Sequence, residues 1–370
     1  MSRAPAVIAV SLLALAGLGA PLSAQTRTVN VYNWSDYVEP TVIEAFTKET
    51  GIKVRYDTFD ANETLETKLL AGKSGYDVVV PTAYFLERQI KAGVFQKLDK
   101  SKLKNIGNVW PEIARRLAIY DPGNQYSVNY MWGTTGIGYN VKAARDVLKI
   151  DGSVAEAMAT WDVVFKPENL ARFKDCGVHM LDSADDIMPA ALHYLGLNPN
   201  STDASELDKA ADLLMKIRSS VRKFHSSEYL NALAGGEICL VVGWSGDIKQ
   251  AQKRAIESKN GIEIGYSIPK EGAQMFFDNL AIPNDASHVA EAHAFIDYLL
   301  RPDVAAKNSN LVAYANGNLA SQKMIDKSVF DDKSVYPDAA TMSHLYTVSA
   351  RDQKSQRLLN RLWTKIKTGR

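Results

Sequence analysis

The chain has 370 residues, about two to three times the ~150 residues of an average domain, so we expect two lobes. Hydrophobic residues make up 46% of the chain and charged residues 23%, which argues against wholesale disorder and against an integral membrane protein. The 43 Lys and Arg residues nearly balance the 42 Asp and Glu residues, so no basic excess is left to neutralise the phosphates of a nucleic acid.

The first 24 residues are typical of a secretory signal peptide. Arg3 supplies a positive charge, residues 6–20 form an apolar run, and the small residue Ala24 ends the segment, so we predict cleavage after Ala24. A membrane anchor is the alternative, but the run lacks the ~20 residues that a transmembrane helix needs. Cleavage would remove one basic residue and no acidic one, which leaves 42 of each.

Two cysteines, Cys176 and Cys239, form an even pair. In an exported protein such a pair is a disulfide candidate, with two buried free thiols as the alternative. Closing a loop of about 60 residues would stabilise the fold by ~4 kcal/mol if chain entropy dominates. Neither cysteine has the Cys-x-x-Cys spacing of redox catalysts.

Strand-like and helix-like segments alternate after the signal. The apolar periodicity predicts strands at 28–34, 52–59 and 76–80, with helices at 40–50 and 62–71 between them. This β-α-β-α-β order predicts a mostly parallel sheet that is covered by helices on both faces.

A glycine-rich stretch interrupts this pattern. Residues 127–132 and 136–140 read as two consecutive strands, and Gly133, Gly136 and Gly138 give the stretch unusual backbone freedom. A second α/β series then follows, with strands at 178–181 and 238–242, helices from Asp185 and Ala204, a basic helix at 248–259, strands at 262–268 and 275–282, and an amphipathic helix after Asp352.

The glycine-rich stretch separates the two α/β series, and the sequence has no flexible linker there. This predicts an α/β protein of two lobes that are joined by strands crossing between them. We assign residues 25–135 with 250–305 to the N-terminal lobe, and residues 136–249 with 306–370 to the C-terminal lobe. In such sheets, ligands bind in the crevice beyond the carboxyl ends of the strands.

Motifs of enzymes are missing from the sequence. The six histidines contain no H-E-x-x-H, no G-x-S-x-G occurs, and the glycines at 133–138 lack the spacing of a nucleotide-binding loop. We therefore expect no catalysis, no cofactor and no metal site.

Aromatic residues pair with carboxylates at three predicted strand ends. The pairs are Trp34 with Asp36 and Tyr37, Trp244 with Asp247, and Phe276 with Asp278. A ring packs on methylenes and attracts an ammonium by ~0.5–2 kcal/mol, and a carboxylate accepts charge-assisted hydrogen bonds from it. The pattern predicts a site for an aliphatic chain with an ammonium at each end. The alternatives are that the Asp residues cap helices and that the Trp residues belong to the core.

The sequence resembles the periplasmic polyamine-binding proteins of spermidine/putrescine ABC importers, most of all the putrescine-binding branch. Seven short sequence motifs carry this resemblance. The resemblance runs from Val29 to the C-terminus, and the motifs lie at 31–37, 76–81, 132–140, 223–227, 243–247, 267–272 and 298–303. It implies a two-lobed type II periplasmic binding protein, with a mixed, mostly parallel sheet in each lobe and the ligand cleft between the lobes. Such a protein would be a periplasmic monomer without direct membrane insertion that delivers a polyamine to permease subunits in the inner membrane.

The resemblance also implies roles for individual residues. Rings around the ligand methylenes would come from Trp34, Tyr37, Trp244, Phe276 and Tyr314. One ammonium would be bound by Asp247 and Asp278, and the other end by Ser35, Asp36 and Asp185. Polar contacts would come from Thr82 and Ser226, and Cys176 and Cys239 would form a disulfide.

Two positions depart from the putrescine-type pattern. That pattern has Glu where this chain has Asp185, and a small residue where this chain has Tyr84 in the pocket floor, whereas Phe276 is the putrescine-type residue. The prediction is therefore a polyamine, with putrescine first and spermidine, agmatine or another small cation as alternatives. An amino acid or sugar receptor and a secreted hydrolase that uses the Asp pairs remain further alternatives. A receptor for an amino acid is expected to have an Arg in its cleft that binds the carboxylate of the ligand, and none of the three pairs contains an Arg.

Overall fold

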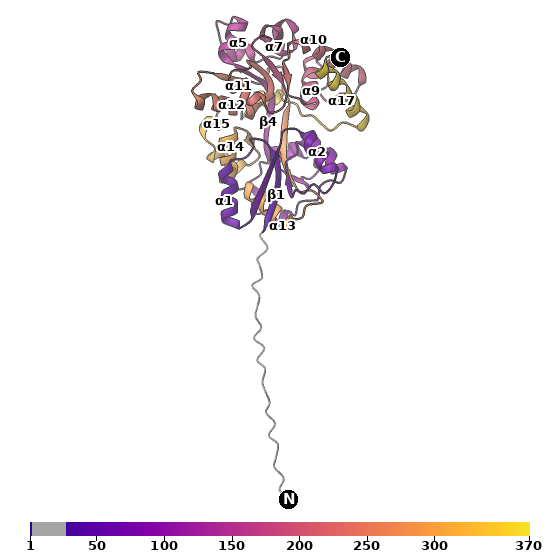
Figure 1. Ribbon diagram of the computed structural model, residues 1–370, viewed down its shortest axis with the longest axis vertical. Helices are drawn as coiled ribbons and strands as arrows, with labels where there is room; N and C mark the ends of the chain where they lie inside the picture. Colours follow the sequence, from indigo (N-terminus) through magenta and orange to yellow (C-terminus); the bar gives the residue numbers. More distant parts are fainter. Residues whose placement is uncertain (2–26) are drawn as a thin grey trace.

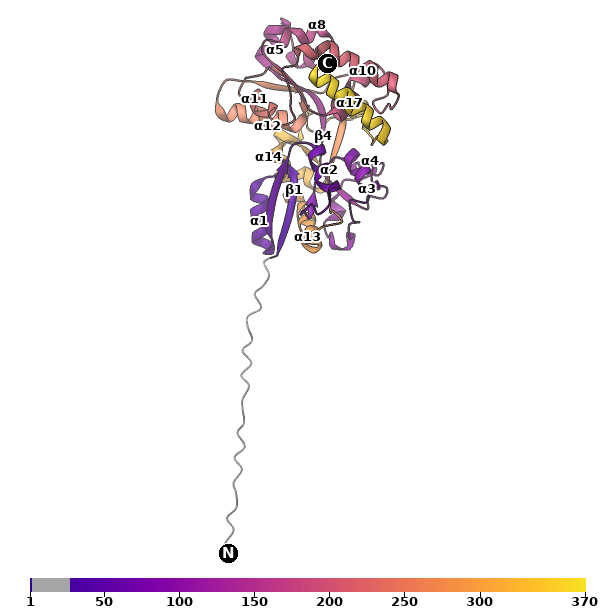
Figure 2. The same cartoon turned by 45° about the vertical axis from the view of Figure 1, so that its right-hand side comes forward.

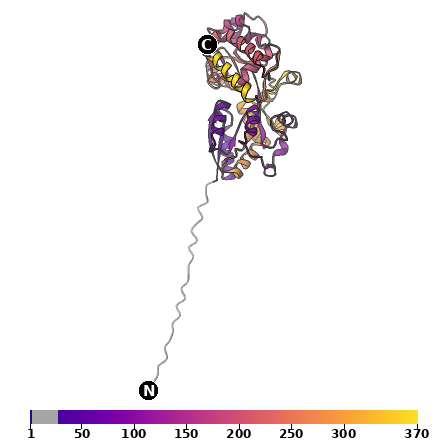
Figure 3. The same ribbon diagram turned by 90° about the vertical axis from the view of Figure 1, so that its right-hand side faces the viewer.

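The computed structural model describes Met1 and residues 27–370, which form two lobes stacked one above the other (Figure 1). The predicted cleavage site after Ala24 and nearly all of the predicted signal peptide lie outside the described residues. A view turned by 90° again separates the two lobes (Figure 3). This is the mixed α/β, two-lobed architecture that the sequence predicts.

The lower lobe in Figure 1 begins with the predicted β-α-β-α-β series. Strand β1 pairs in parallel with both β2 and β3, as expected. Helix α1 begins with Pro40 at its first position and ends at Gly51 in the left-handed conformation, which are favoured residues for those two places. The elements of this segment are β1 (Thr28–Trp34), α1 (Pro40–Thr50), β2 (Lys53–Phe59), α2 (Asn62–Leu70), β3 (Val78–Val79), α3 (Ala83–Lys91), two short 3₁₀ helices (Lys100–Lys102 and Ile106–Asn108) and α4 (Pro111–Leu117).

One long strand, β4 (Ser127–Asn140), connects the lobes, where the sequence predicted two consecutive strands. Its first half pairs with β9 (Met275–Ala281) and its second half with β7 (Leu240–Trp244) and β8 (Ile264–Ser267). The glycines do not break the strand but allow close packing against it. A Cβ atom on Gly136 would lie only 2.5 Å from the hydroxyl oxygen of Tyr266 and 2.7 Å from the carbonyl oxygen of Ser267.

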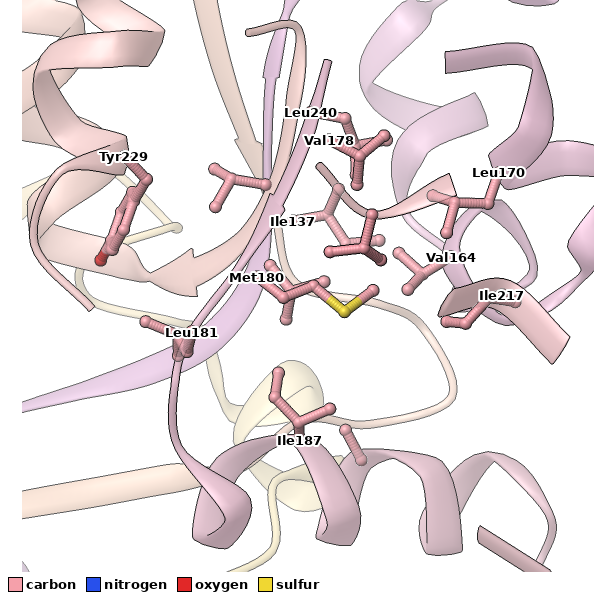
Figure 4. Close-up of a cluster of buried hydrophobic side chains, with 14 of the residues drawn as sticks. Ile137, Val164, Leu170, Val178, Met180, Leu181, Ile187, Ile217, Tyr229 and Leu240 are labelled. Carbon is pink, nitrogen blue, oxygen red and sulfur yellow. The ribbon is translucent and has the colours of Figure 1, made fainter. Parts of the chain in front are cut away.

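The upper lobe forms around β5, β6, β7 and β8. Figure 4 shows Ile137, Val178 and Met180 of its sheet next to Val164 and Ile187 of the flanking helices, all of them buried. The elements of this segment are α5 (Val141–Leu148), α6 (Val154–Met158), α7 (Asp162–Phe165), α8 (Pro167–Leu170), β5 (Val178–Met180), α9 (Ala184–Tyr194), α10 (Ala204–Ile217), β6 (Lys223–Phe224), α11 (Tyr229–Ala234), β7 (Leu240–Trp244), α12 (Ser245–Ser258) and β8 (Ile264–Ser267), with 3₁₀ turns at Ala171–Phe173 and Arg218–Ser220.

After β8 the chain returns to the lower lobe and finally crosses back. The remaining elements are β9 (Met275–Ala281), α13 (Val289–Leu299), α14 (Pro302–Val312), β10 (Ala315–Asn316), a 3₁₀ helix (Leu319–Met324), α15 (Lys327–Phe330), α16 (Ala339–His344) and α17 (Gln353–Thr368). A single sheet runs through both lobes in the order β2-β1-β3-β9-β4-β7-β5-β6. Helix α17 lies on the outside of the upper lobe (Figure 2).

The two hydrophobic cores divide the chain differently from the predicted boundaries. Ala251 and Ile264, expected in the N-terminal lobe, belong to the core of the upper lobe. Val312 and Tyr314, expected in the C-terminal lobe, belong to the core of the lower lobe. The cores differ from the predicted division because β8 pairs with the second half of β4 and α14 packs against α1, and neither contact has a local signal in the sequence.

A disulfide joins Cys176 to Cys239, with 5.7 Å between the Cα atoms, which confirms the expected pairing. It ties the loop before β5 to the start of β7 within the upper lobe. Among the residues that the structure describes, no helix is both long enough and apolar enough to span a membrane.

Candidate functional site

A cleft between the lobes opens beyond the carboxyl ends of β1 and β7. It contains about 590 Å³ of empty space, including space that is open to solvent. The residues that line it come from both lobes: Trp34, Ser35, Asp36, Tyr37, Phe59, Asp60, Asn62, Thr82, Tyr84, Asp186, Ser226, Ser227, Leu230, Trp244, Asp247, Phe276, Asp278 and Tyr314. Five of them are aspartates, and none is Lys, Arg or His.

Aromatic rings from both lobes form the walls of the cleft. The Trp34 ring of the lower lobe meets the Trp244 ring of the upper lobe edge-on, at 5.6 Å between centroids. Phe276 lies 6.3 Å from both Trp244 and Tyr314, and Tyr37 lies 4.9 Å from Tyr314. The rings thus give the cleft apolar walls, and we call the space that they line the slot.

The Tyr314 ring has its place because residue 246 is a glycine. A Cβ atom on Gly246 would lie 2.1 Å from the Tyr314 ring, closer than any side chain permits. The Gly-Trp-Ser-Gly-Asp string that carries part of the family resemblance therefore has a packing role in addition to placing Trp244 and Asp247.

Asp278 lies in the middle of β9 and is almost completely buried. Its two oxygens accept hydrogen bonds from the hydroxyls of Tyr37 at 2.7 Å and Thr82 at 2.6 Å. Thr82 is held in turn by the side-chain amide of Asn62 at 2.9 Å. Burial raises the pKa of Asp278 to about 7, although both hydroxyls lower it, because no cation compensates the charge.

Asp247 lies in the first turn of α12, directly after β7. It accepts hydrogen bonds of 2.7 Å from the hydroxyls of Tyr229 and Tyr314. Burial raises the pKa of Asp247 to about 6, against the lowering effect of the two tyrosine donors. Both carboxylates are therefore held in place by neutral donors and lack a positive partner within the cleft.

Asp186, which the sequence analysis did not select, is the third buried carboxylate of the cleft. It accepts hydrogen bonds from Thr135 at 2.7 Å, from Ser183 at 2.6 Å and from the indole nitrogen of Trp244 at 3.3 Å. Burial raises its pKa, and the three donors oppose the shift.

Asp185 does not line the cleft, and its contact with the ligand, directly or through water, stays a prediction. Its Oδ1 accepts a hydrogen bond of 2.7 Å from Arg351, and both side chains are buried. The sequence shows two adjacent aspartates at the start of a helix, and without the helix orientation it could not tell which one faces the cleft. Asp186 takes the place that was expected of Asp185.

Tyr84 contributes a hydroxyl to the cleft. The side chain is 4% exposed, and no hydrogen bond joins it to another described residue. Burial raises the pKa of this hydroxyl, and so do the nearby charges of Asp186, Asp185, Glu63 and Asp278. A phenol that lies among carboxylates and donates to none of them is placed to donate to a bound molecule or a water.

At the rim of the cleft, Asp36 forms an ion pair across the two lobes. Its Oδ1 lies 2.9 Å from Nη2 of Arg254 on α12, and the backbone of Asp36 is left-handed, with φ of 54°. Arg254 also donates to Asn231 of its own lobe at 2.7 Å. Ser35 is held to Phe59 by its backbone nitrogen at 2.9 Å, so this turn is fixed on the lower lobe.

The structure brings twelve of the thirteen predicted ligand residues to one cleft, with Asp185 as the exception. It adds Phe59, Asp60, Asn62, Asp186, Ser227 and Leu230. Phe59 and Asp60 stand at the end of a predicted strand and repeat the pairing of ring and carboxylate, so the same signal could have found them. Leu230 lies on a helix and had no such signal. In the described part of the chain, no group of His, Cys, Asp and Glu is arranged to hold a metal ion.

Comparison with known proteins gives consistent results. The family described as bacterial extracellular solute-binding protein matches residues 41–335. The putrescine-binding periplasmic protein SpuD of Pseudomonas aeruginosa is 50% identical over 364 residues, which cover 97% of each chain. The putrescine-binding periplasmic protein PotF of Escherichia coli is 49% identical over 350 residues, 94% of each chain.

A solved structure shares the fold as well. The putative spermidine/putrescine ABC transporter from Listeria monocytogenes superimposes with a TM-score of 0.81 at 32% identity, over 93% of this chain and 100% of that one. These similarities confirm both the two-lobed fold and the resemblance to polyamine-binding proteins. The chain belongs to the family of bacterial extracellular solute-binding proteins.

Proposed function

We propose that this protein is a periplasmic receptor that captures a polyamine, with putrescine as the first candidate, and delivers it to an ABC permease in the inner membrane. The observation that carries the proposal is the composition of the cleft, in which aromatic walls surround five aspartates and no basic side chain. The names of the relatives, which are putrescine-binding periplasmic proteins, support the same ligand class.

A linear diammonium ion matches this arrangement chemically. Its methylenes would lie in the slot between Trp34, Trp244 and Phe276, where apolar contact and attraction of the cation to the rings both contribute. Its ammonium groups would donate charge-assisted hydrogen bonds to Asp278 and Asp247 on one side and to Asp186 or Asp36 on the other. The dication would thereby replace the missing positive charge of the cleft.

Two observations leave room for a ligand other than putrescine. Tyr84 places a hydroxyl where the putrescine-type pattern has a small residue, and Asp185 is one methylene shorter than the Glu of that pattern. The slot therefore suits other linear cations, including agmatine and spermidine. A hydrolase is disfavoured because each of the buried carboxylates is held by hydroxyl donors in a ring-walled slot, which is an arrangement for binding.

The test is calorimetry of the refolded, ligand-free protein against putrescine, cadaverine, agmatine and spermidine, with glutamate and glucose as controls. We expect micromolar or tighter binding of at least one polyamine and no binding of the controls. The absence of binding to all four polyamines would refute the proposal. Size-exclusion chromatography with light scattering would test the expectation of a monomer.

A further inference from the structure

Helix α17 is fixed firmly to the upper lobe by its inner face. Leu359, Leu362, Trp363 and Ile366 are buried, and the indole nitrogen of Trp363 donates to Asp182 at 2.9 Å. The carbonyl oxygen of Lys367 accepts two hydrogen bonds from the guanidinium of Arg218, at 3.0 and 2.8 Å. The helix thus presents its outer face in a defined orientation (Figures 2 and 3).

The outer face of α17 is rich in basic residues, and its exposed neutral residues are Gln353, Asn360, Thr364 and Thr368. Lys354, Arg357, Arg361 and Lys365 are all exposed, and their spacing of three, four and four residues places them on one side of the helix. At ~1.5 Å per residue the four cations extend over about 16 Å. No acidic residue occurs from 353 to 370. We call these four residues the basic face.

The basic face has no partner within the molecule. Among the described residues, none of the four side chains forms an ion pair, whereas Lys367 on the flank of the helix pairs with Asp182 at 2.8 Å. The neighbouring helix α10 carries exposed Asp208 and Asp212, and neither forms an ion pair with α17. In a chain whose charges balance overall, this is a local surplus of positive charge.

We propose that the basic face of α17 binds the surface of an anionic phospholipid membrane. Four cations on one rigid face complement a layer of phosphate groups, and each Lys or Arg near such a surface adds to the attraction. A protein partner would be expected to need an apolar or aromatic anchor on the face, since such anchors supply most of the binding energy in protein interfaces. The exposed large hydrophobic residues of the described chain all lie outside α17.

The basic face and the cleft are separate, so the proposal of membrane binding and the proposal of polyamine binding can fail independently. None of the four basic residues lines the cleft. A receptor held loosely at the membrane would search for its permease along a surface rather than through a volume. Membrane binding would therefore assist the proposed transport role, whichever ligand the cleft binds.

The experiment is co-sedimentation of the mature protein with two kinds of vesicle, phosphatidylcholine alone and phosphatidylcholine with about one third phosphatidylglycerol, at low and at high salt. We expect binding only to the anionic vesicles at low salt. The triple variant R357Q/R361Q/K365Q should bind at least tenfold more weakly. The matched control K48Q/K104Q/K323Q removes the same charge from exposed lysines outside α17 and should bind as the native protein does.

Circular dichroism spectra and melting temperatures of both triple variants test whether they are folded, independently of any ligand. Equal binding to the two kinds of vesicle would overturn the proposal, and so would an equal loss in the two triple variants, which would indicate an effect of net charge alone. A third result would also overturn it: no binding to lipid vesicles, together with a loss of binding by the α17 variant to vesicles that contain the permease. That result would assign the face to an acidic protein surface.

Discussion

Arg351 reaches Asp185 from the segment that crosses between the lobes before α17, and the 2.7 Å ion pair is buried with side-chain exposures of only 2% and 3%. The same guanidinium donates to the carbonyl oxygen of Pro199 at 3.3 Å. The pair holds the first turn of α9, whose next residue, Asp186, faces the cleft. The Asp185–Arg351 pair thus fixes the turn of the helix from which Asp186 reaches the cleft.

The variant Arg351→Gln should lower the free energy of unfolding by about 3–5 kcal/mol, because the charge of Asp185 would stay buried without its partner. Urea denaturation measures this loss. The double variant D185N/R351Q should recover part of it, since it removes the uncompensated charge. As a control, Lys142→Gln breaks an exposed pair with Asp146 and should cost less than about 1 kcal/mol. A loss in Arg351→Gln no larger than this control would contradict a role of the pair in the fold.

The variant Asp278→Asn should weaken polyamine binding at least 100-fold, because an ammonium would face a neutral amide in a buried site, at a cost of about 3 kcal/mol or more. Calorimetry measures the affinity, and Asp208→Asn on the exposed face of α10 serves as the matched control. An unchanged affinity in Asp278→Asn would remove Asp278 from the ligand site.

Polyamine affinity should fall as the solution is acidified. The ligand requires ionised carboxylates, whereas the free cleft favours protonated ones, with the pKa of Asp278 near 7 and that of Asp247 near 6. Between about pH 8 and about pH 5.5 we expect a loss of roughly one to two orders of magnitude. Binding near neutral pH should also release protons, and calorimetry in buffers of different ionisation enthalpy would detect them. A flat pH profile would contradict the raised pKa values.

The stability of the ligand-free protein should show the opposite trend. The folded protein retains a proton on Asp278 that the unfolded chain loses near its usual pKa, so stability is lost as the pH rises towards about 7. From about pH 5.5 to about pH 7 this group alone should cost ~2 kcal/mol. Asp278→Asn, which does not titrate, should flatten the dependence of the melting temperature on pH, and an identical slope in both proteins would refute this explanation.

The ion pair of Asp36 with Arg254 should slow the opening of the lobes by a modest factor. Both side chains are partly exposed, at 51% and 36%, so we expect a coupling of at most ~1 kcal/mol. A double-mutant cycle of Asp36→Asn and Arg254→Gln, read out as the dissociation rate of the ligand, measures it. The coupling should shrink at high salt, and a coupling of zero at low salt would show that the pair does not contribute to closure.

The sequence predicted the regular elements near β1 well, because the strand at 28–34 and the helix at 40–50 carry clear periodicities and a terminal glycine. It also predicted the disulfide, and it predicted seven residues of the cleft from the pairing of ring and carboxylate at strand ends, whereas Ser35, Thr82, Tyr84, Ser226 and Tyr314 came from the family resemblance alone. The orientation of α9 could not be predicted from the sequence. Which of Asp185 and Asp186 faces the cleft depends on the contact of Asp185 with Arg351, which lies 166 residues away in the chain. The lobe boundaries could not be predicted either, because the strands that pair with β4 are distant from it in the chain.

The position of β9 between β3 and β4 has a consequence for biogenesis. When the ribosome has produced only the first 135 residues, the lower lobe lacks the strand that joins its two halves, and β3 presents an unpaired edge. That edge stays open until residues 275–281 emerge, so the sheet can close only late in synthesis or after it. For the proposed periplasmic receptor, this delay would keep the chain in a form that can be threaded through a membrane pore.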